Sequence, residues 1–170
     1  FALQAALNPP KPGKQERRFG ELIFREGDRV MQTRNDYDVV WQKEDGTAGT
    51  GIFNGDVGKI AKIDPSGELL EIVFDDRTAT YTSDMLAELD MAYAMTVHKA
   101  QGSEYRGVVF VGAPCAPSLM VRGVLYTAIT RARELLVIVG DDSAVNKMAE
   151  NDRRSRRYSG LKWKMKKGGE

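Results

Sequence analysis

Short runs of alternating apolar and polar residues, separated by turn-forming residues, occupy residues 36–89. Turns are expected at Asp45-Gly46, at Asn54-Gly55-Asp56 and at Asp75-Asp76, because these residue types favour tight reversals of the chain. The glycine-rich residues 47–51 are expected to form a loop. Four or five short strands joined in this way predict a small closed β-barrel.

The spacing of apolar residues changes after Leu89. Val108–Val111 and Leu135–Val139 are continuous apolar runs, typical of strands that are buried on both faces. Between them, apolar residues recur at helical spacing from Val121 to Arg133. This alternation of strand and helix predicts a parallel sheet covered by helices.

The N-terminal part carries weaker patterns. Residues 1–20 are expected to be irregular, because the proline-rich stretch Asn8–Gly13 disfavours a helix. A turn at Glu26-Gly27-Asp28 is then expected to lead into a short strand, Arg29–Thr33.

The C-terminal part is expected to contain one more helix, capped by Asp142 or Ser143 and ending near Asn151. The basic residues 153–170 that follow predict a solvated tail. The alternative is a DNA-contacting arm in which the two aromatic residues of this tail stack on bases.

Composition narrows the classes of function. The chain has 170 residues, 42% of them hydrophobic, which is enough for one medium domain or two small ones. The net charge of +1 creates no global basic field, so any binding of nucleic acid must depend on local patches. A single cysteine, Cys115, excludes an internal disulfide and favours a reducing compartment. No apolar run approaches the roughly 20 residues that cross a bilayer, so no membrane partner is expected.

The densest group of chemically capable side chains lies between Thr96 and Glu104. It contains a hydroxyl, the only histidine, a lysine, an amide, a glycine and a carboxylate. A helix beginning near Val97 would present free backbone N–H groups that bind phosphates. The alternative is a capped helix with an ordinary solvated face, and His98 taken alone favours that alternative.

Residues 91–140 resemble the fifth and sixth motifs of superfamily-1 DNA helicases, in the RecD-like branch often called exodeoxyribonuclease V alpha subunits. The resemblance rests on the string from Ala92 to Tyr105 and on the string from Leu125 to Arg133. Gly27–Tyr37 also matches the strand that leads into the barrel of that branch. The barrel itself looks SH3-like. The implied fold is α/β, a partial RecA-like sheet of P-loop NTPase type with helices, plus a small all-β SH3-like barrel.

The resemblance implies roles for individual residues. Thr96 and His98 would contact single-stranded DNA, and Gln101 would serve either DNA or nucleotide. Gly102 and Glu104 would approach ATP, with the carboxylate suited to a ribose hydroxyl.

Two further roles follow from the same resemblance. Arg131, within Thr130-Arg131-Ala132, would act as an arginine finger on the γ-phosphate, because a planar guanidinium matches the charge of phosphoryl oxygens. Without the resemblance, an arginine at the end of a helix would only favour the helix dipole. Arg133 is expected to be a surface or packing residue. Asn35, or its neighbour Arg34, would reach the DNA backbone, although strand-end and turn chemistry explain an Asn-Asp pair equally well.

The resemblance divides the chain into four parts. Residues 1–35 would be a lead-in and the first strand of the second RecA-like domain, and residues 36–89 would be the inserted barrel. Residues 90–152 would carry the rest of that domain, and residues 153–170 the tail.

No Gly-x-x-x-x-Gly-Lys-Ser/Thr phosphate loop occurs in the sequence. ATP and Mg²⁺ are therefore expected to bind only in a full-length parent protein, with the Mg²⁺ ligands outside this chain. The first residue is Phe1 and not methionine, so the chain is expected to be cut from a longer one whose first RecA-like domain lies upstream.

The function implied is that of the C-terminal part of an ATP-dependent 5′-to-3′ DNA helicase of the bacterial cytoplasm, acting in recombination or repair. Its partners would be single-stranded DNA, the upstream RecA-like domain and other exonuclease V subunits. One alternative is a nucleic-acid-binding adaptor without motor activity, and a conjugative relaxase-helicase is a variant of the helicase reading. Another is an SH3-like module that binds proline-rich peptides through Trp41, Phe53 and Tyr81.

Overall fold

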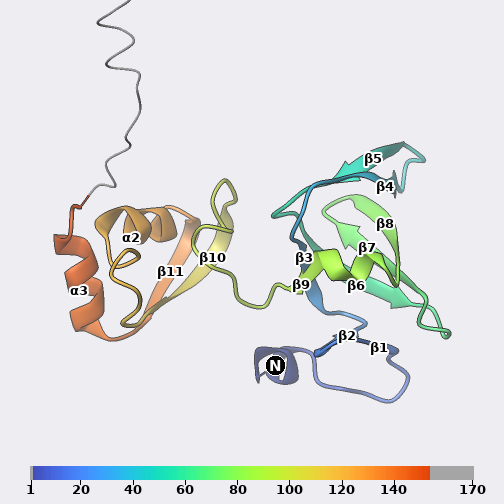
Figure 1. Ribbon diagram of the computed structural model, residues 1–170, viewed down its shortest axis with the longest axis horizontal. Coiled ribbons are helices and arrows are strands. Elements are labelled where there is room, and N and C mark those ends of the chain that lie inside the picture. Colours follow the sequence, from blue (N-terminus) through green and yellow to red (C-terminus); the bar gives the residue numbers. More distant parts are fainter. Residues whose placement is uncertain (1, 154–170) are drawn as a thin grey trace, which may run out of the picture. The chain divides into compact units, whose positions relative to one another are not determined.

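The computed structural model describes residues 2–153 and shows two compact units (Figure 1). The first unit extends to Lys99 and the second begins at Ala100. Among residues 2–153, no helix has both the length and the apolar character that crossing a membrane requires. The prediction of a solvated or DNA-contacting tail concerns residues that lie almost entirely outside the described part.

The first unit begins with a short helix, α1 (Ala2–Leu7), and a hairpin of β1 (Glu16–Phe19) and β2 (Leu22–Arg25). The prediction that residues 1–20 are irregular is therefore wrong for α1 and β1, whereas residues 8–15 between them contain no helix or strand. The sequence of α1 is rich in alanine and leucine, which favour helices. Gly20, with φ of 58°, supplies the left-handed backbone that a two-residue hairpin loop requires.

A seven-stranded antiparallel sheet forms most of the first unit, with the strand order β5-β4-β8-β7-β6-β3-β9. Its strands are β3 (Arg29–Gln32), β4 (Asp36–Lys43), β5 (Ala48–Ile52), β6 (Val57–Ile63), β7 (Leu69–Phe74), β8 (Arg77–Thr82) and β9 (Leu89–Met91), with the 3-10 helix η1 (Met85–Glu88) before β9. The predicted strands of residues 36–89 and the turns between them are confirmed. Closure of the barrel is not, because the edge strands β5 and β9 are not hydrogen-bonded to each other.

The glycine-rich residues 47–51, predicted as a loop, instead contribute strand β5. Trp41 on β4 pairs with Gly49 on β5, and a Cβ atom added to Gly49 would lie 2.4 Å from the indole ring. Glycine is therefore required here because the Trp41 ring lies against the neighbouring strand. The Arg77 guanidinium covers the same ring at 5.8 Å from its centroid.

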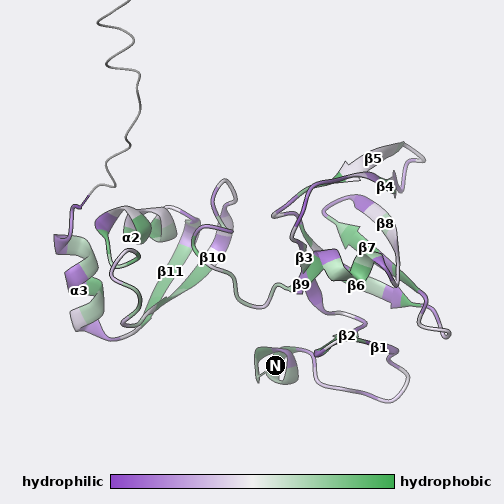
Figure 2. Cartoon of the chain, viewed as in Figure 1, coloured by the Kyte–Doolittle hydropathy of each residue, from purple (hydrophilic) through white to green (hydrophobic). Residues whose placement is uncertain are grey.

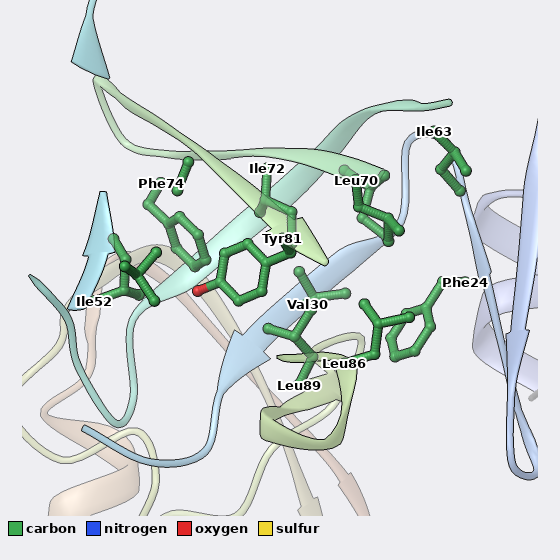
Figure 3. Packing of buried hydrophobic residues seen from close by; sticks show 13 residues of the cluster. Phe24, Val30, Ile52, Ile63, Leu70, Ile72, Phe74, Tyr81, Leu86 and Leu89 are labelled. Carbon is green, nitrogen blue, oxygen red and sulfur yellow. The ribbon is translucent and has the colours of Figure 1, made fainter. Parts of the chain in front are cut away.

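The core of the first unit lies inside this curved sheet, where Tyr81 packs among Phe74, Ile72 and Val30 (Figure 3). Tyr81 is fully buried, and burial raises the pKa of its hydroxyl. The hydroxyl donates to Gln32 Oε1 at 2.9 Å, so the polar atom keeps a partner inside the apolar cluster.

The second unit contains two parallel strands, β10 (Tyr105–Gly112) and β11 (Ala132–Gly140), and two helices, α2 (Arg122–Ile129) and α3 (Asp142–Glu150). The predicted alternation of strand and helix is confirmed. Helix α2 contacts both strands, and α3 contacts α2 and β10. The parallel sheet is shown here only as this pair of strands.

The prediction that both strands are buried on both faces is wrong for the described residues. Val109, Val111 and Leu135 are 66%, 67% and 60% exposed. Figure 2 shows the apolar character of both strands. A strand is buried on both faces only when elements cover both, and the described part of this unit contains only α2 and α3.

Two boundaries of the second unit also differ from expectation. Helix α2 ends at Ile129, so Arg131 lies in the following turn and Arg133 on β11. The cap of α3 is Asp141, whose side chain accepts a hydrogen bond from the backbone N–H of Ser143 at 2.8 Å.

Candidate functional site

The segment that resembles the fifth helicase motif forms a turn at residues 97–102, so the helix predicted from Val97 is wrong. Thr96 Oγ1 accepts from the backbone N–H of Lys99 at 3.3 Å, as a helix cap would. The turn then closes at Gly102, whose φ is 93°. A helix cannot continue through this left-handed residue, and strand β10 starts at Tyr105.

The side chains predicted to contact DNA lie on this turn or beside it. Thr96, His98 and Gln101 are all exposed. The Lys99 ammonium forms an exposed ion pair with Asp90 at 3.4 Å, on strand β9 of the same unit. The turn therefore presents hydroxyl, imidazole and amide groups to solvent.

Asn35 contacts a loop, residues 53–56, that lies beside Lys99. Its side-chain oxygen accepts from the backbone N–H of Asn54 at 3.0 Å. A Cβ atom added to Gly55, the next residue, would lie 3.9 Å from the carbonyl oxygen of Lys99. The loop that Asn35 holds therefore lies near Lys99 within the first unit, and the Asn35 side chain makes the turn contact considered as an alternative.

Arg131 connects two predicted nucleotide-facing segments of the second unit. Its Nη1 donates to the carbonyl oxygen of Ser103 at 2.9 Å, and its Nε donates to the carbonyl oxygen of Thr127 at 3.1 Å. Its Nη2 donates to Thr130 Oγ1 at 3.3 Å. A guanidinium has five N–H donors, so about two remain for a ligand. Ser103 lies between Gly102 and Glu104, so the structure places all three beside Arg131.

Glu104 forms an ion pair with Arg133, which was predicted only as a surface or packing residue. Arg133 Nε donates to Glu104 Oε2 at 2.7 Å, and both side chains are at least half exposed. The pairing of Tyr105 with Ala132 in the parallel sheet brings these two side chains together. Strand register is not readable from one sequence, so the sequence held no clear indication of this pair.

Thr96 and His98 belong to the first unit, whereas Gly102, Glu104 and Arg131 belong to the second. The predicted site residues thus form two clusters. One, with Thr96, His98 and Asn35, lies in the first unit, and the other surrounds Arg131 in the second unit, to which Gln101 also belongs.

Sequence reasoning missed Tyr93, which precedes the turn. Its hydroxyl donates to the buried carboxylate of Asp28 at 2.7 Å. Burial, followed by this hydrogen bond, raises the pKa of Tyr93 to about 12. A tyrosine close before a polar segment was the only indication available from the sequence.

The nucleotide and metal implied by the resemblance can be tested against these residues. The remaining N–H donors of Arg131 and the exposed Glu104 carboxylate fit part of a nucleotide. Among residues 2–153, no cluster of histidine, cysteine and acidic side chains is suited to hold a metal ion. The peptide-binding alternative loses Tyr81, which is completely buried and cannot line a groove.

Each of the two units contains residues that match a family of known proteins. Residues 1–74 match the family model of the ATP-dependent RecD-like DNA helicase SH3 domain, and residues 91–139 match that of the UvrD-like helicase C-terminal domain. The ATP-dependent RecD2 DNA helicase of Deinococcus radiodurans is 36% identical over 156 residues, covering 92% of this chain and 20% of that protein. The chain is RecD-like along both of its units.

This RecD-like chain is also 30% identical over 143 residues to the RecBCD enzyme subunit RecD of Mycobacterium tuberculosis, with 84% of the chain and 22% of that protein covered. It therefore spans about a fifth of the length of these two relatives.

Among solved structures, a Bacteroides Pif1 helicase bound to single-stranded DNA aligns with a TM-score of 0.53 at 18% identity, covering 99% of this chain and 43% of that one. Its complex with ADP-AlF3 and single-stranded DNA aligns with a TM-score of 0.51 at 18% identity, covering 99% and 42%. At this level of identity the likeness concerns the fold alone.

Proposed function

We propose that the chain forms part of an ATP-dependent DNA helicase, to which it contributes contacts to single-stranded DNA and an arginine finger. One observation carries the proposal. The Arg131 guanidinium donates to Ser103 at 2.9 Å, so the ends of the two helicase-like motifs meet around one cation. The name of the Deinococcus relative, a RecD2 DNA helicase, supports this reading.

On the nucleotide side, Arg131 would direct its remaining N–H donors at the γ-phosphate. Phosphoryl transfer spreads negative charge over the transferred oxygens, and a positioned guanidinium stabilises that charge. Glu104 would accept from a ribose hydroxyl, and Gly102, which carries no side chain, would allow close approach of the nucleotide. No Mg²⁺ ligand is proposed within residues 2–153.

On the DNA side, Thr96, His98, Gln101 and Asn35 would contact the sugar-phosphate backbone. Hydroxyl and amide side chains are common donors to phosphate, and such contacts position a strand without reading its sequence. The exposure of the turn at residues 97–102 supports this assignment. Directional movement would be 5′-to-3′, with single-stranded DNA and other exonuclease V subunits as partners.

The four-part division of the chain belongs to the same proposal. Residues 90–152 would contribute to a second RecA-like domain, of which β10 and β11 are neighbouring strands. Strand β3, predicted as the first strand of that domain, instead pairs with β6 and β9 in the sheet of the first unit. Residues 36–89 would form the SH3-like insert of the RecA-like domain and residues 153–170 a basic tail. The match of residues 1–74 to the RecD-like SH3 model supports an SH3-like domain within the first unit.

The proposal is tested by Arg131→Ala in the full-length protein, with DNA-stimulated ATP hydrolysis as the measurement. Loss of an arginine finger is expected to reduce kcat by about 10³-fold or more, with a smaller effect on nucleotide affinity. Arg106→Ala is the matched control, because Arg106 is an exposed arginine of the same unit that pairs with Glu134. Near-normal turnover by Arg131→Ala would remove the proposed role.

A further inference from the structure

Asp28 is a completely buried carboxylate that accepts four hydrogen bonds. Its Oδ1 accepts from Asn8 Nδ2 at 2.6 Å and from the Tyr93 hydroxyl at 2.7 Å. Its Oδ2 accepts from Gln4 Nε2 at 2.6 Å and from the backbone N–H of Arg25 at 2.8 Å. A carboxylate has about four acceptor positions, so Asp28 is fully satisfied.

The four donors to Asp28 come from three separate parts of the chain. Gln4 lies on α1 and Asn8 follows that helix. Arg25 ends β2, and Tyr93 follows β9. One buried side chain therefore fastens the N-terminal helix, the hairpin and the segment that leads into the 97–102 turn. Losing a donor costs more in such a buried network than at the surface.

Tyr93 is the last of three successive contacts between two segments. Val30 pairs with Met91 in the sheet, and the backbone N–H of Ala92 donates to the carbonyl oxygen of Arg29 at 2.8 Å. Tyr93 then reaches Asp28. These contacts fix the path of the backbone immediately before Thr96 and His98.

We propose that Asp28, acting through Tyr93, is a positioning residue that holds the start of the DNA-contacting turn. The inference rests on the proposed function, because it concerns the same DNA contacts. Asp28 itself is buried and touches no substrate. Its effect is to limit the conformations of residues 94–102, so that less order has to be gained when a strand binds.

The matched variants are Tyr93→Phe and Gln4→Met, both made in the full-length protein. Each removes a donor to Asp28, but only Tyr93 belongs to the segment entering the turn. Gln4 also donates to the carbonyl oxygen of Ile23 at 2.7 Å, so Gln4→Met removes two hydrogen bonds and is the more damaging change to the fold. Affinity for a fluorescent oligothymidylate and the melting temperature are measured for both.

Tyr93→Phe is expected to weaken binding of the oligonucleotide by about three- to tenfold, with a small change in melting temperature. Gln4→Met is expected to lower the melting temperature more and to leave affinity within about twofold. Equal changes in affinity for both variants, or an unchanged affinity for Tyr93→Phe, would overturn the inference, because a purely structural role affects both in proportion to stability.

Hydrogen exchange separates this inference from the proposed function. The backbone N–H groups of Lys99 and Ser103, which donate to Thr96 and Ala100, should exchange faster in Tyr93→Phe than in Gln4→Met. If the wild-type protein fails to bind the oligonucleotide, the proposed DNA contacts are wrong, and faster exchange still supports the positioning of the turn. Equal exchange in both variants would contradict it.

Discussion

Arg131 and Arg133 are two residues apart and have different surroundings. Arg131 is half-buried and makes three hydrogen bonds within the chain, which hold its guanidinium in one place. Arg133 is exposed and makes an ion pair with Glu104. A held guanidinium is suited to stabilise charge without reorganising, whereas an exposed ion pair is worth little because water and salt screen it.

The exposed Arg133 and the buried Arg25 are expected to differ in how much stability is lost when each is replaced. Arg133→Ala should lower the free energy of unfolding by less than about 1 kcal/mol. Arg25→Ala should lower it by about 2 kcal/mol or more, because Arg25 is buried and bonds Glu16 at 2.6 Å and the carbonyl oxygen of Asn8. Urea unfolding of the three proteins measures both values. A larger loss of unfolding free energy for Arg133→Ala would show that the exposed ion pair with Glu104 stabilises the fold more than expected.

Tyr93 makes a pH-dependent contribution to stability. Its pKa is raised from 10.0 to about 12, so folding favours the neutral hydroxyl. That contribution is fully present below pH 10 and is lost as pH rises through about 12. Stability should therefore fall over this interval more steeply in the wild type than in Tyr93→Phe, as measured by urea unfolding at a series of pH values. Parallel curves would show that the hydroxyl does not titrate in this way.

At the scale of elements, strand β5 shows how a glycine pattern serves packing. Gly49 gives room to the Trp41 ring, and Gly58 on β6 gives room in the same manner to Ile72 and Phe74. Glycine normally weakens a strand because it has no side chain to pack. Here the ring of a neighbouring strand fills that space.

Gly49→Ala is expected to destabilise the first unit by about 1–3 kcal/mol, because the new methyl group would overlap the Trp41 ring. Gly123→Ala is the matched control. Gly123 lies in α2 with nothing within 4 Å of an added Cβ, so the same change should stabilise that helix by up to about 1 kcal/mol. Thermal unfolding measures both. The two substitutions should change the free energy of unfolding in opposite directions. An unchanged stability for Gly49→Ala would mean that the Trp41 ring can move aside.

At the scale of the whole molecule, the two units differ in how completely they are packed. The first unit encloses a buried cluster that includes Phe24, Leu70 and Tyr81. The second has few buried apolar residues and exposes Val109, Val111 and Leu135 on its strands. The chain therefore holds one well-enclosed unit and one whose sheet is only partly covered by described residues.

The 170-residue chain alone is expected to show negligible ATP hydrolysis, because its sequence has no phosphate-binding loop. The measurement is phosphate release with Mg²⁺ and single-stranded DNA, with the full-length protein as the positive control. Robust Mg²⁺-dependent turnover by the pure chain would refute the expectation and would require another nucleotide site.

The regular strands could be predicted from the sequence because alternation and turn residues are local features, as in β6, β7 and β8. The end of α2 could not, because helical spacing continues through Ala132 while the chain already turns at Thr130. The sequence predicted a helix at residues 97–102, where the structure has a turn. The Thr96 hydroxyl can accept a hydrogen bond from the backbone N–H of Lys99 in either conformation, so this residue pattern does not distinguish the two. The contacts of Asp28 and Arg133 depend on sheet register and tertiary packing, which one sequence does not display.

The first unit encloses its apolar core and the second does not, and this difference has a consequence for synthesis on the ribosome. The first unit has all its strands by Met91, so its core can close while the rest of the chain is still being made. Strand β10 emerges next, but its partner β11 begins only at Ala132, and until then the backbone N–H and C=O groups of β10 lack the strand with which they pair. The nascent chain is therefore expected to be most prone to aggregation and to chaperone binding after Met91 has emerged and before β11 has been made.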